Sequence, residues 1–98
     1  MSVLMTLRVS GDPKEVEATD PDVLKTIIAR AKEHGVISHH FYGSDKEILV
    51  VDEWPDEQTF QKFFDSQPDI PKIMAAAGVT THPEITFYRE LELGDAIG

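Results

Sequence analysis

Apolar strands and amphipathic helices alternate along this chain in an order that few small folds accommodate. Residues 1–9 carry Val3, Met5, Leu7 and Val9 on one side and Leu4 on the other, which is typical of a central strand covered on both faces. Residues 36–42 and 47–54 flank a four-residue loop that begins at Gly43, and this arrangement predicts a β-hairpin. Period-2 alternation over residues 84–93 predicts a last strand.

The first helix is predicted over residues 21–34. Asp20 supplies an N-cap side chain, and Pro21 is favoured at the first helical position. Gly35 stands where a helix commonly ends in the left-handed conformation. The acidic stretch before this helix, residues 14–19, is interpreted as a surface loop.

A second helical segment follows the hairpin. Pro55 and Asp56 end the preceding strand and start the helix, which Pro68 then interrupts. Apolar residues at helical spacing over residues 70–77 predict a short third helix, which Gly78 would terminate.

The resulting order, β-α-β-β-α-(α)-β, predicts an α+β fold of the ferredoxin-like type. Its four-stranded antiparallel sheet would have the strand order 4-1-3-2, with the helices on one face. The other face would carry four large apolar or aromatic side chains, which favours coverage by a second copy in a face-to-face homodimer. These residues are Leu4, Leu49, Val51 and Tyr88. Residues 1–98 are expected to form one domain, with a short tail over residues 93–98.

Charge and cysteine content narrow the functional classes. The formal net charge is −9, from 18 acidic and 9 basic residues, and the basic residues are scattered, which disfavours nucleic acids and anionic membranes as partners. Neutral or apolar substrates fit this surface better. The absence of cysteine excludes disulfides and thiolate chemistry. The first ten residues do not resemble a signal peptide and no apolar run is long enough to span a membrane, so we expect a cytoplasmic location.

Successive side chains of a strand point to opposite faces, and this alternation divides the residues of the hairpin between the two sheet faces. The predicted cross-strand pairs are Phe41–Ile48, His39–Val50 and Ile37–Asp52. One face then carries His39, Phe41, Ile48, Val50, Asp52 and Trp54. The other carries His40, Tyr42, Glu47, Leu49, Val51 and Glu53. The adjacent histidines therefore point in opposite directions and cannot share a metal ion.

Two interpretations of His39 and Asp52, which lie diagonally on one face, remain open. The carboxylate could orient the imidazole for proton transfer inside a pocket, or the two could form a structural polar pair at the sheet edge. A metal site would need a third ligand, for which His82 is the only spare imidazole, so we expect no metal. His40 could pack in the dimer interface or contribute to a pocket shared with the partner.

Aromatic residues at helical spacing follow the hairpin. With Trp54, they could form core or line the wall of an aromatic pocket. The predicted substrate-contacting residues are Phe41, Trp54, Phe60, Phe63, Phe64 and Phe87.

The element order, together with the segments ILVVDEWPDEQTFQKFF and PEITFY, resembles the antibiotic biosynthesis monooxygenase-like family of dimeric α+β barrels. The matching positions are Ile48 to Trp54, then Glu57, Phe60 and Phe63, and finally Ile85 to Tyr88. The resemblance implies a pocket between the helices and the sheet of each subunit. Some members oxidise aromatic polyketides or quinols without a metal or flavin, and others degrade haem.

The residues that characterise two branches of that family are missing from this sequence. The haem-degrading branch has an Asn on its first strand, whereas residues 1–9 contain none, and Phe63 stands at its Trp position. The quinol monooxygenase branch carries a His in the second helical segment, and residues 61–74 contain none.

Two functions from different classes follow. The first is a monooxygenase without a cofactor, in which His39 or His40 removes a proton from a small aromatic or quinol-like compound. The second is a dimeric domain without catalytic activity that only holds an apolar molecule. A polar group converging on an apolar pocket discriminates between them: a packed His39 with Asp52 as its only partner and no cavity beside it would exclude the enzyme.

Overall fold

The computed structural model describes residues 2–76 and 82–98. In chain order the elements are β1 (Val3–Ser10), α1 (Pro13–Glu17), α2 (Pro21–Glu33), β2 (Ser38–Gly43), β3 (Glu47–Trp54), α3 (Glu57–Asp65), α4 (Asp69–Ala76) and β4 (Glu84–Tyr88). The strands form one antiparallel sheet in the order β2-β3-β1-β4, which is the predicted order read from the opposite edge. The ferredoxin-like α+β fold is therefore confirmed.

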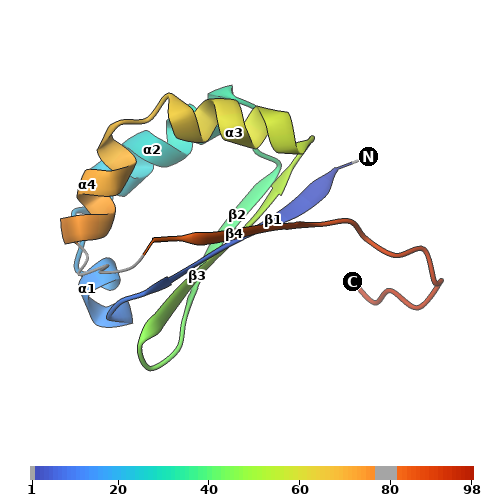
Figure 1. Ribbon diagram of the computed structural model, residues 1–98, viewed down its shortest axis with the longest axis horizontal. Coiled ribbons are helices and arrows are strands. Elements are labelled where there is room, and N and C mark those ends of the chain that lie inside the picture. Colours follow the sequence, from blue (N-terminus) through green and yellow to red (C-terminus); the bar gives the residue numbers. More distant parts are fainter. Residues whose placement is uncertain (1, 77–81) are drawn as a thin grey trace.

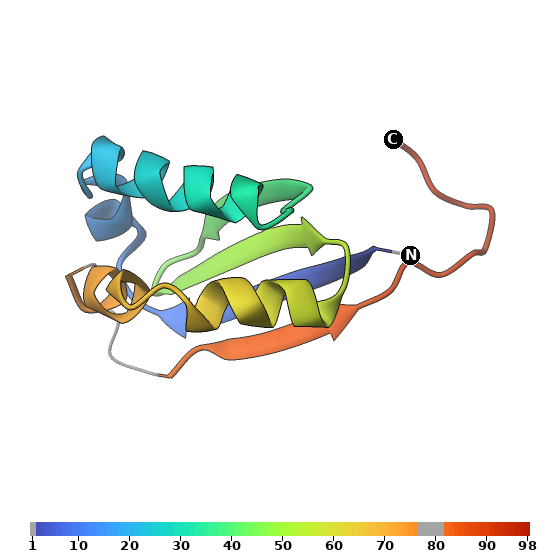
Figure 2. The same ribbon diagram turned by 90° about the horizontal axis from the view of Figure 1, so that it is seen from above.

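The molecule has two layers. Helices α2, α3 and α4 lie over one face of the sheet, and no described helix covers the other face (Figure 1). Seen from above, α2 runs along one side of the sheet, while α3 and α4 follow one another along the other side (Figure 2). The core lies between the layers and consists of Met5, Leu7, Val9, Ala31, Ile48, Trp54, Phe60 and Phe63.

The helix predicted from Asp20 and Pro21 is confirmed as α2. The Asp20 carboxylate accepts a hydrogen bond from the Asp22 backbone N–H at 2.9 Å, which satisfies one of the free donors of the first turn. After the helix, Gly35 has a φ of 105°, a conformation that favours glycine. The predicted third helix corresponds to α4, and the predicted stop at Gly78 lies outside the described residues.

The interpretation of residues 14–19 as a loop is wrong over most of its length, because α1 occupies Pro13–Glu17. Asp12 caps this helix by accepting a hydrogen bond from the Lys14 backbone N–H at 2.9 Å. The signal is the same Asp-Pro pair that predicted α2. The helix has only five residues, so no apolar periodicity accompanies the cap.

The last strand is shorter than predicted, since β4 ends at Tyr88 and residues 89–93 do not continue it. Strand β4 pairs with β1 only as far as Tyr88, which lies opposite Leu4. Beyond that pair the chain leaves the sheet and runs away from the rest of the molecule (Figure 1). Alternation at Leu91 and Leu93 was therefore insufficient to define a strand without a neighbouring strand to pair with.

The predicted hairpin register is wrong by two residues. Gly43 belongs to β2 and pairs with Ile48, so the loop has three residues, 44–46, and not four. His39 consequently lies directly opposite Asp52. A shift of two residues leaves every side chain on its predicted face, so the division of the hairpin between the two faces is confirmed.

The helix-free face of the sheet carries the apolar residues predicted for it. Leu4 lies opposite Tyr88, and the two side chains keep 41% and 52% of their surface exposed. Leu49 and Val51 are partly buried, and Tyr42, opposite Leu49, is exposed.

In the described part of the chain, none of the helices is long and apolar enough to cross a membrane.

Asp56 is the N-cap of α3. Its carboxylate accepts hydrogen bonds from the Thr59 hydroxyl and from the Thr59 backbone N–H, each at 2.7 Å. The bond from the hydroxyl, followed by that from the N–H, holds the pKa of the Asp56 carboxyl below its usual value. Below neutral pH the unfolded chain therefore takes up a proton at Asp56 before the folded chain does.

This cap predicts an acid-dependent part of the stability. The contribution of Asp56 is present above the unfolded pKa and is lost as the pH falls through the lower folded pKa. We expect Asp56→Asn, which keeps a cap but has no titrating group, to show a flatter decline of Tm between about pH 5 and pH 2 than the wild type. Thermal unfolding followed by circular dichroism measures this. Parallel declines in the two proteins would contradict it.

Candidate functional site

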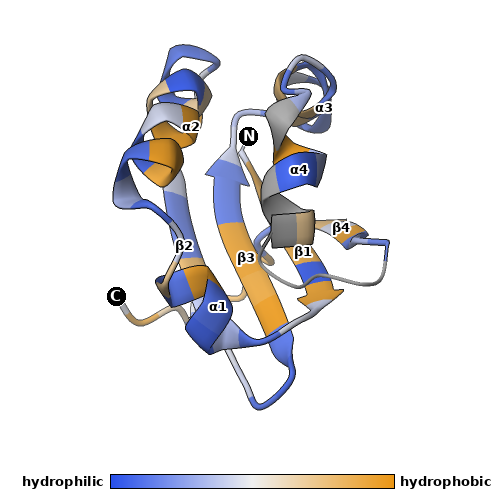
Figure 3. Cartoon of the chain, turned by 90° about the vertical axis from the view of Figure 1, so that its left-hand side faces the viewer, coloured by the Kyte–Doolittle hydropathy of each residue, from blue (hydrophilic) through white to orange (hydrophobic). Residues whose placement is uncertain are grey.

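A cavity of about 140 Å³ lies between the helices and the sheet. Residues of α2, of α3 and α4, and of the central strands line it. Figure 3 shows α2 standing over one side of the sheet and α3 with α4 over the other. The Arg30 guanidinium of α2 donates a hydrogen bond to the side-chain oxygen of Gln67 at 2.9 Å, which ties α2 to the segment after α3. The apolar wall residues include Val16, Leu24, Ile27, Ile28, Ile48, Val50 and Ile70.

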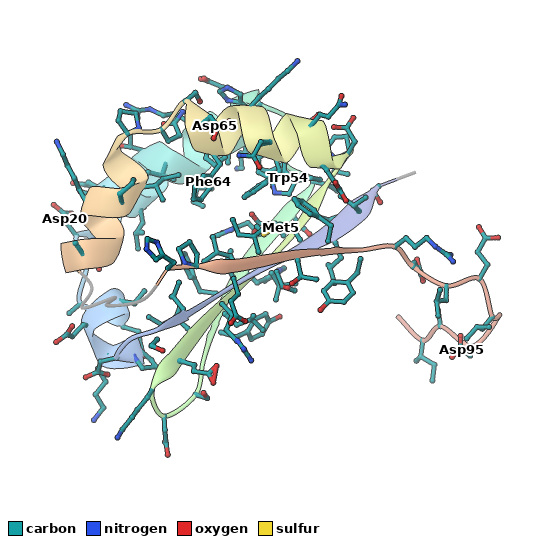
Figure 4. The ribbon with its side chains drawn as sticks, viewed as in Figure 1. Met5, Asp20, Trp54, Phe64, Asp65 and Asp95 are labelled. Atoms are coloured by element: carbon teal, nitrogen blue, oxygen red, sulfur yellow. The ribbon has the colours of Figure 1, made fainter. Side chains whose placement is uncertain are left out.

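The aromatic part of this layer comes mainly from α3. Phe60, Phe63 and Phe64 all contribute to the cavity wall, because their spacing along the helix places them on the face turned to the sheet. In Figure 4 the Phe64 side chain reaches from α3 into the space above the sheet, where Met5 and Trp54 also lie.

His39 and Asp52 meet in the wall of the cavity. They face each other across β2 and β3, and His39 Nδ1 lies 2.6 Å from Asp52 Oδ1. The other carboxylate oxygen, Oδ2, accepts a hydrogen bond from Trp54 Nε1–H at 3.1 Å. Both Asp52 oxygens are thus engaged in a buried setting, and the carboxylate is held in one orientation.

The second nitrogen of the His39 ring has no such partner. Nε2 is buried and makes no hydrogen bond to any described residue. When the imidazole is neutral and its proton lies on Nδ1, bonded to Asp52, Nε2 is a hydrogen-bond acceptor and a base. A buried polar atom without a partner costs about 1 to 3 kcal/mol, which a bound donor would recover.

Phe41 lies beside His39. Its ring meets the imidazole edge-on, with centroids 4.8 Å apart and planes at 89°. Phe41 also contributes to the cavity wall, yet 44% of its surface is exposed. This side chain therefore stands between the cavity and solvent at the β2 edge of the sheet.

The structure brings together six of the nine predicted site residues at the cavity: His39, Phe41, Asp52, Phe60, Phe63 and Phe64. His40 lies on the opposite sheet face near Tyr42, with ring centroids 6.2 Å apart. Trp54 is fully buried, and Phe87 packs against Phe60 at a centroid distance of 5.7 Å. Neither is among the residues that line the cavity.

Reasoning from the sequence missed the aliphatic wall contributed by α2. Leu24, Ile27 and Ile28 stand three or four residues apart, which places them on one face of α2 and was the available signal. It also missed the hydrogen bond from Trp54 to Asp52. Because residues two apart on a strand share a face, the sequence carried the signal for that contact.

The arrangement combines a buried, oriented imidazole with an apolar cavity. Asp52 is the hydrogen-bond partner of His39, but a cavity lies beside the pair, so the arrangement that would exclude an enzyme is not the one observed. Within residues 2–76 and 82–98, no three His, Cys, Asp or Glu side chains gather as metal ligands would. Acid–base chemistry on a small apolar molecule is what these groups can perform.

No protein-family model and no curated protein matches the chain. Among solved structures it is similar to SnoaB, a cofactor-independent oxygenase from Streptomyces nogalater, with a TM-score of 0.66 and 19% identity over 97% of this chain and 98% of that one. A conserved protein from Methanosarcina mazei Go1 has a TM-score of 0.66 and 16% identity, covering 93% and 94% of the two chains.

A third structure, described as an antibiotic biosynthesis monooxygenase, has a TM-score of 0.64 and 6% identity, covering 91% of this chain and 98% of that one. At such identities the likeness concerns the fold. The chain therefore has the fold of solved antibiotic biosynthesis monooxygenases, as the resemblance in its sequence predicted.

Proposed function

We propose that this protein is a cofactor-independent monooxygenase that acts on a small aromatic compound bearing a hydroxyl group. The observation that carries the proposal is His39, whose Nδ1 is fixed by Asp52 while its Nε2 is buried without a partner in the wall of an apolar cavity. The similarity to a structure described as a cofactor-independent oxygenase supports the same reaction class. The cytoplasmic location is part of the proposal and rests on the sequence alone.

In this proposal His39 acts as a general base. Nε2 takes the hydroxyl proton, and the resulting aromatic anion is electron-rich enough to reduce dioxygen itself. One oxygen atom enters the ring and the other leaves as water, with the two hydrogens that the substrate loses. A phenol and O₂ thus give a quinone and water, and no external reductant is required. Asp52 keeps the imidazole oriented throughout.

Oxygen consumption tests this function. We expect the purified protein to consume one O₂ per substrate with members of a panel of phenols, hydroquinones and anthrones, and a metal chelator should leave the rate unchanged. The background is the oxidation of each compound without protein. If no compound is consumed above that background, the proposed oxygenase is wrong, and the apolar cavity then belongs to a binding protein.

We also propose that two copies associate through the helix-free face of the sheet. Leu4, Tyr42 and Tyr88 are exposed there around the partly buried Leu49 and Val51. An open sheet face that carries five large apolar or aromatic side chains is uncommon on a monomer. Beyond β4, three more apolar side chains are exposed on the tail, namely Leu91, Leu93 and Ile97.

A lysine in the middle of that face should separate the copies. We expect the wild type to have twice the 11.0 kDa mass of one chain by light scattering, and Val51→Lys to have the mass of one chain. Ala29→Lys, which places the same charge at an exposed position of α2, is the control and should remain dimeric. A wild-type mass near 11.0 kDa would contradict the dimer.

A further inference from the structure

The unpartnered Nε2 of His39 and the dimensions of the cavity together define the chemistry of the molecule that would fill it. We propose that the cavity selects a neutral compound with a single ring and a hydroxyl group that donates a hydrogen bond to His39 Nε2. This inference takes the site from the proposed function, but it concerns binding and requires no reaction. It also assigns to Trp54 the role of a positioning residue.

The volume sets the size of the ligand. A dry apolar cavity of about 150 Å³ holds one benzene molecule. The cavity here measures about 140 Å³ and is likewise lined mainly by aliphatic and aromatic side chains. One six-membered ring fits this volume, whereas the three fused rings of a tricyclic compound exceed it.

The wall excludes charged ligands. Among its described residues only Thr19, His39 and Asp52 are polar, and none is a lysine or arginine. The Asp52 carboxylate would repel an anion, and transfer of a charged group into such a cavity without a counter-ion is unfavourable. Burying a carboxylate of the ligand would therefore cost more free energy than burying its ring provides.

The hydrogen-bonding direction follows from Asp52 and Trp54. Trp54 Nε1–H bonds to Oδ2 and so leaves Oδ1 directed at His39 Nδ1. A carboxylate can only accept, so the neutral imidazole keeps its proton on Nδ1, and Nε2 must accept from the ligand. A hydroxyl satisfies this nitrogen, whereas an ether or a ketone oxygen offers a second acceptor and leaves it unpaired.

Access to Nε2 requires a side chain to move, because the atom is covered. Phe41 can move and uncover Nε2, since it packs edge-on against the imidazole and is nearly half exposed. Rotation of an exposed aromatic side chain is rapid. The ring of a bound ligand would then replace the contact that Phe41 gives up.

The test uses the single tryptophan of the chain, whose indole N–H gives one signal in a ¹H–¹⁵N spectrum. This N–H bonds to Asp52 and so reports on the occupant of the site. We titrate the wild-type protein with phenol, anisole, benzoate and anthrone. We expect saturable binding of phenol, about 5- to 100-fold weaker binding of anisole, and no saturable shift with benzoate or anthrone.

Anisole binding as tightly as phenol, or anthrone binding more tightly, would overturn the proposal, as would the absence of any phenol shift. The outcome is separable from that of the oxygenase proposal. Phenol binding without oxygen consumption by any compound would refute the reaction and support the ligand class. Oxygen consumption with anthrones and no binding of phenol would support the reaction and refute the ligand class.

Discussion

Replacing Trp54 with alanine is expected to lower the free energy of unfolding by about 3 to 5 kcal/mol. Trp54 is fully buried, and its ring packs against Phe60 and Phe63 at centroid distances of 5.6 and 5.4 Å. Its removal opens a large cavity and deprives Asp52 of a hydrogen-bond donor. Because a domain of this size is stable by only about 5 to 15 kcal/mol, the variant should be close to unfolding.

Urea denaturation followed by circular dichroism measures this effect, since the variant has no tryptophan to fluoresce. Trp54→Phe is the matched control because it keeps an aromatic ring and loses the N–H, so its loss should be clearly smaller. A cost below about 1 kcal/mol for Trp54→Ala would contradict the account of the core, because that is the size of an ordinary surface effect.

Replacing His39 with glutamine is expected to lower kcat/KM for oxygen consumption by about 10² to 10⁴. Glutamine has a similar size and can still donate a hydrogen bond to Asp52, but it has no basic nitrogen at the position of Nε2. The loss should fall mainly on kcat, since the cavity wall and the fold are kept. Steady-state rates with whichever compound the wild type consumes provide the measurement.

His40→Gln is the comparison for this variant, because the adjacent histidine was the other candidate base and lies on the opposite sheet face. We expect its kcat/KM to stay within about threefold of the wild type, because His40 is not among the residues that line the cavity. Equal losses in the two variants would show that the base does not reside at the cavity. An unchanged rate in His39→Gln would exclude His39 as that base.

Much of the fold could be predicted from the sequence because its signals are local. The two-residue alternation divided the hairpin correctly between the faces, and the Asp20–Pro21 pair located the start of α2. The predicted hairpin register was wrong because it depends on whether Gly43 belongs to the strand or to the loop. The alternation of side chains between the two faces is the same in both cases. The prediction that the last strand continues over residues 89–93 was wrong because a strand also needs a neighbouring strand to pair with.

The site was less predictable, since it depends on distances between elements. The sequence placed His39 and Asp52 on one face, but direct contact required the register that the structure shows. The cavity depends on how far α2 stands from α3, which no local pattern encodes. Trp54 was interpreted as a possible contact for substrate, whereas its N–H is turned to Asp52.

The position of the proton on the neutral His39 ring decides whether Nε2 can accept a hydrogen bond from the ligand hydroxyl. Two- and three-bond ¹H–¹⁵N correlation spectra, recorded at a pH at which the ring is neutral, distinguish the two tautomers of an assigned histidine. We expect a proton on Nδ1, bonded to Asp52, and an unprotonated Nε2. A proton on Nε2 would contradict it, because the nitrogen proposed to receive the ligand hydroxyl would then be a donor.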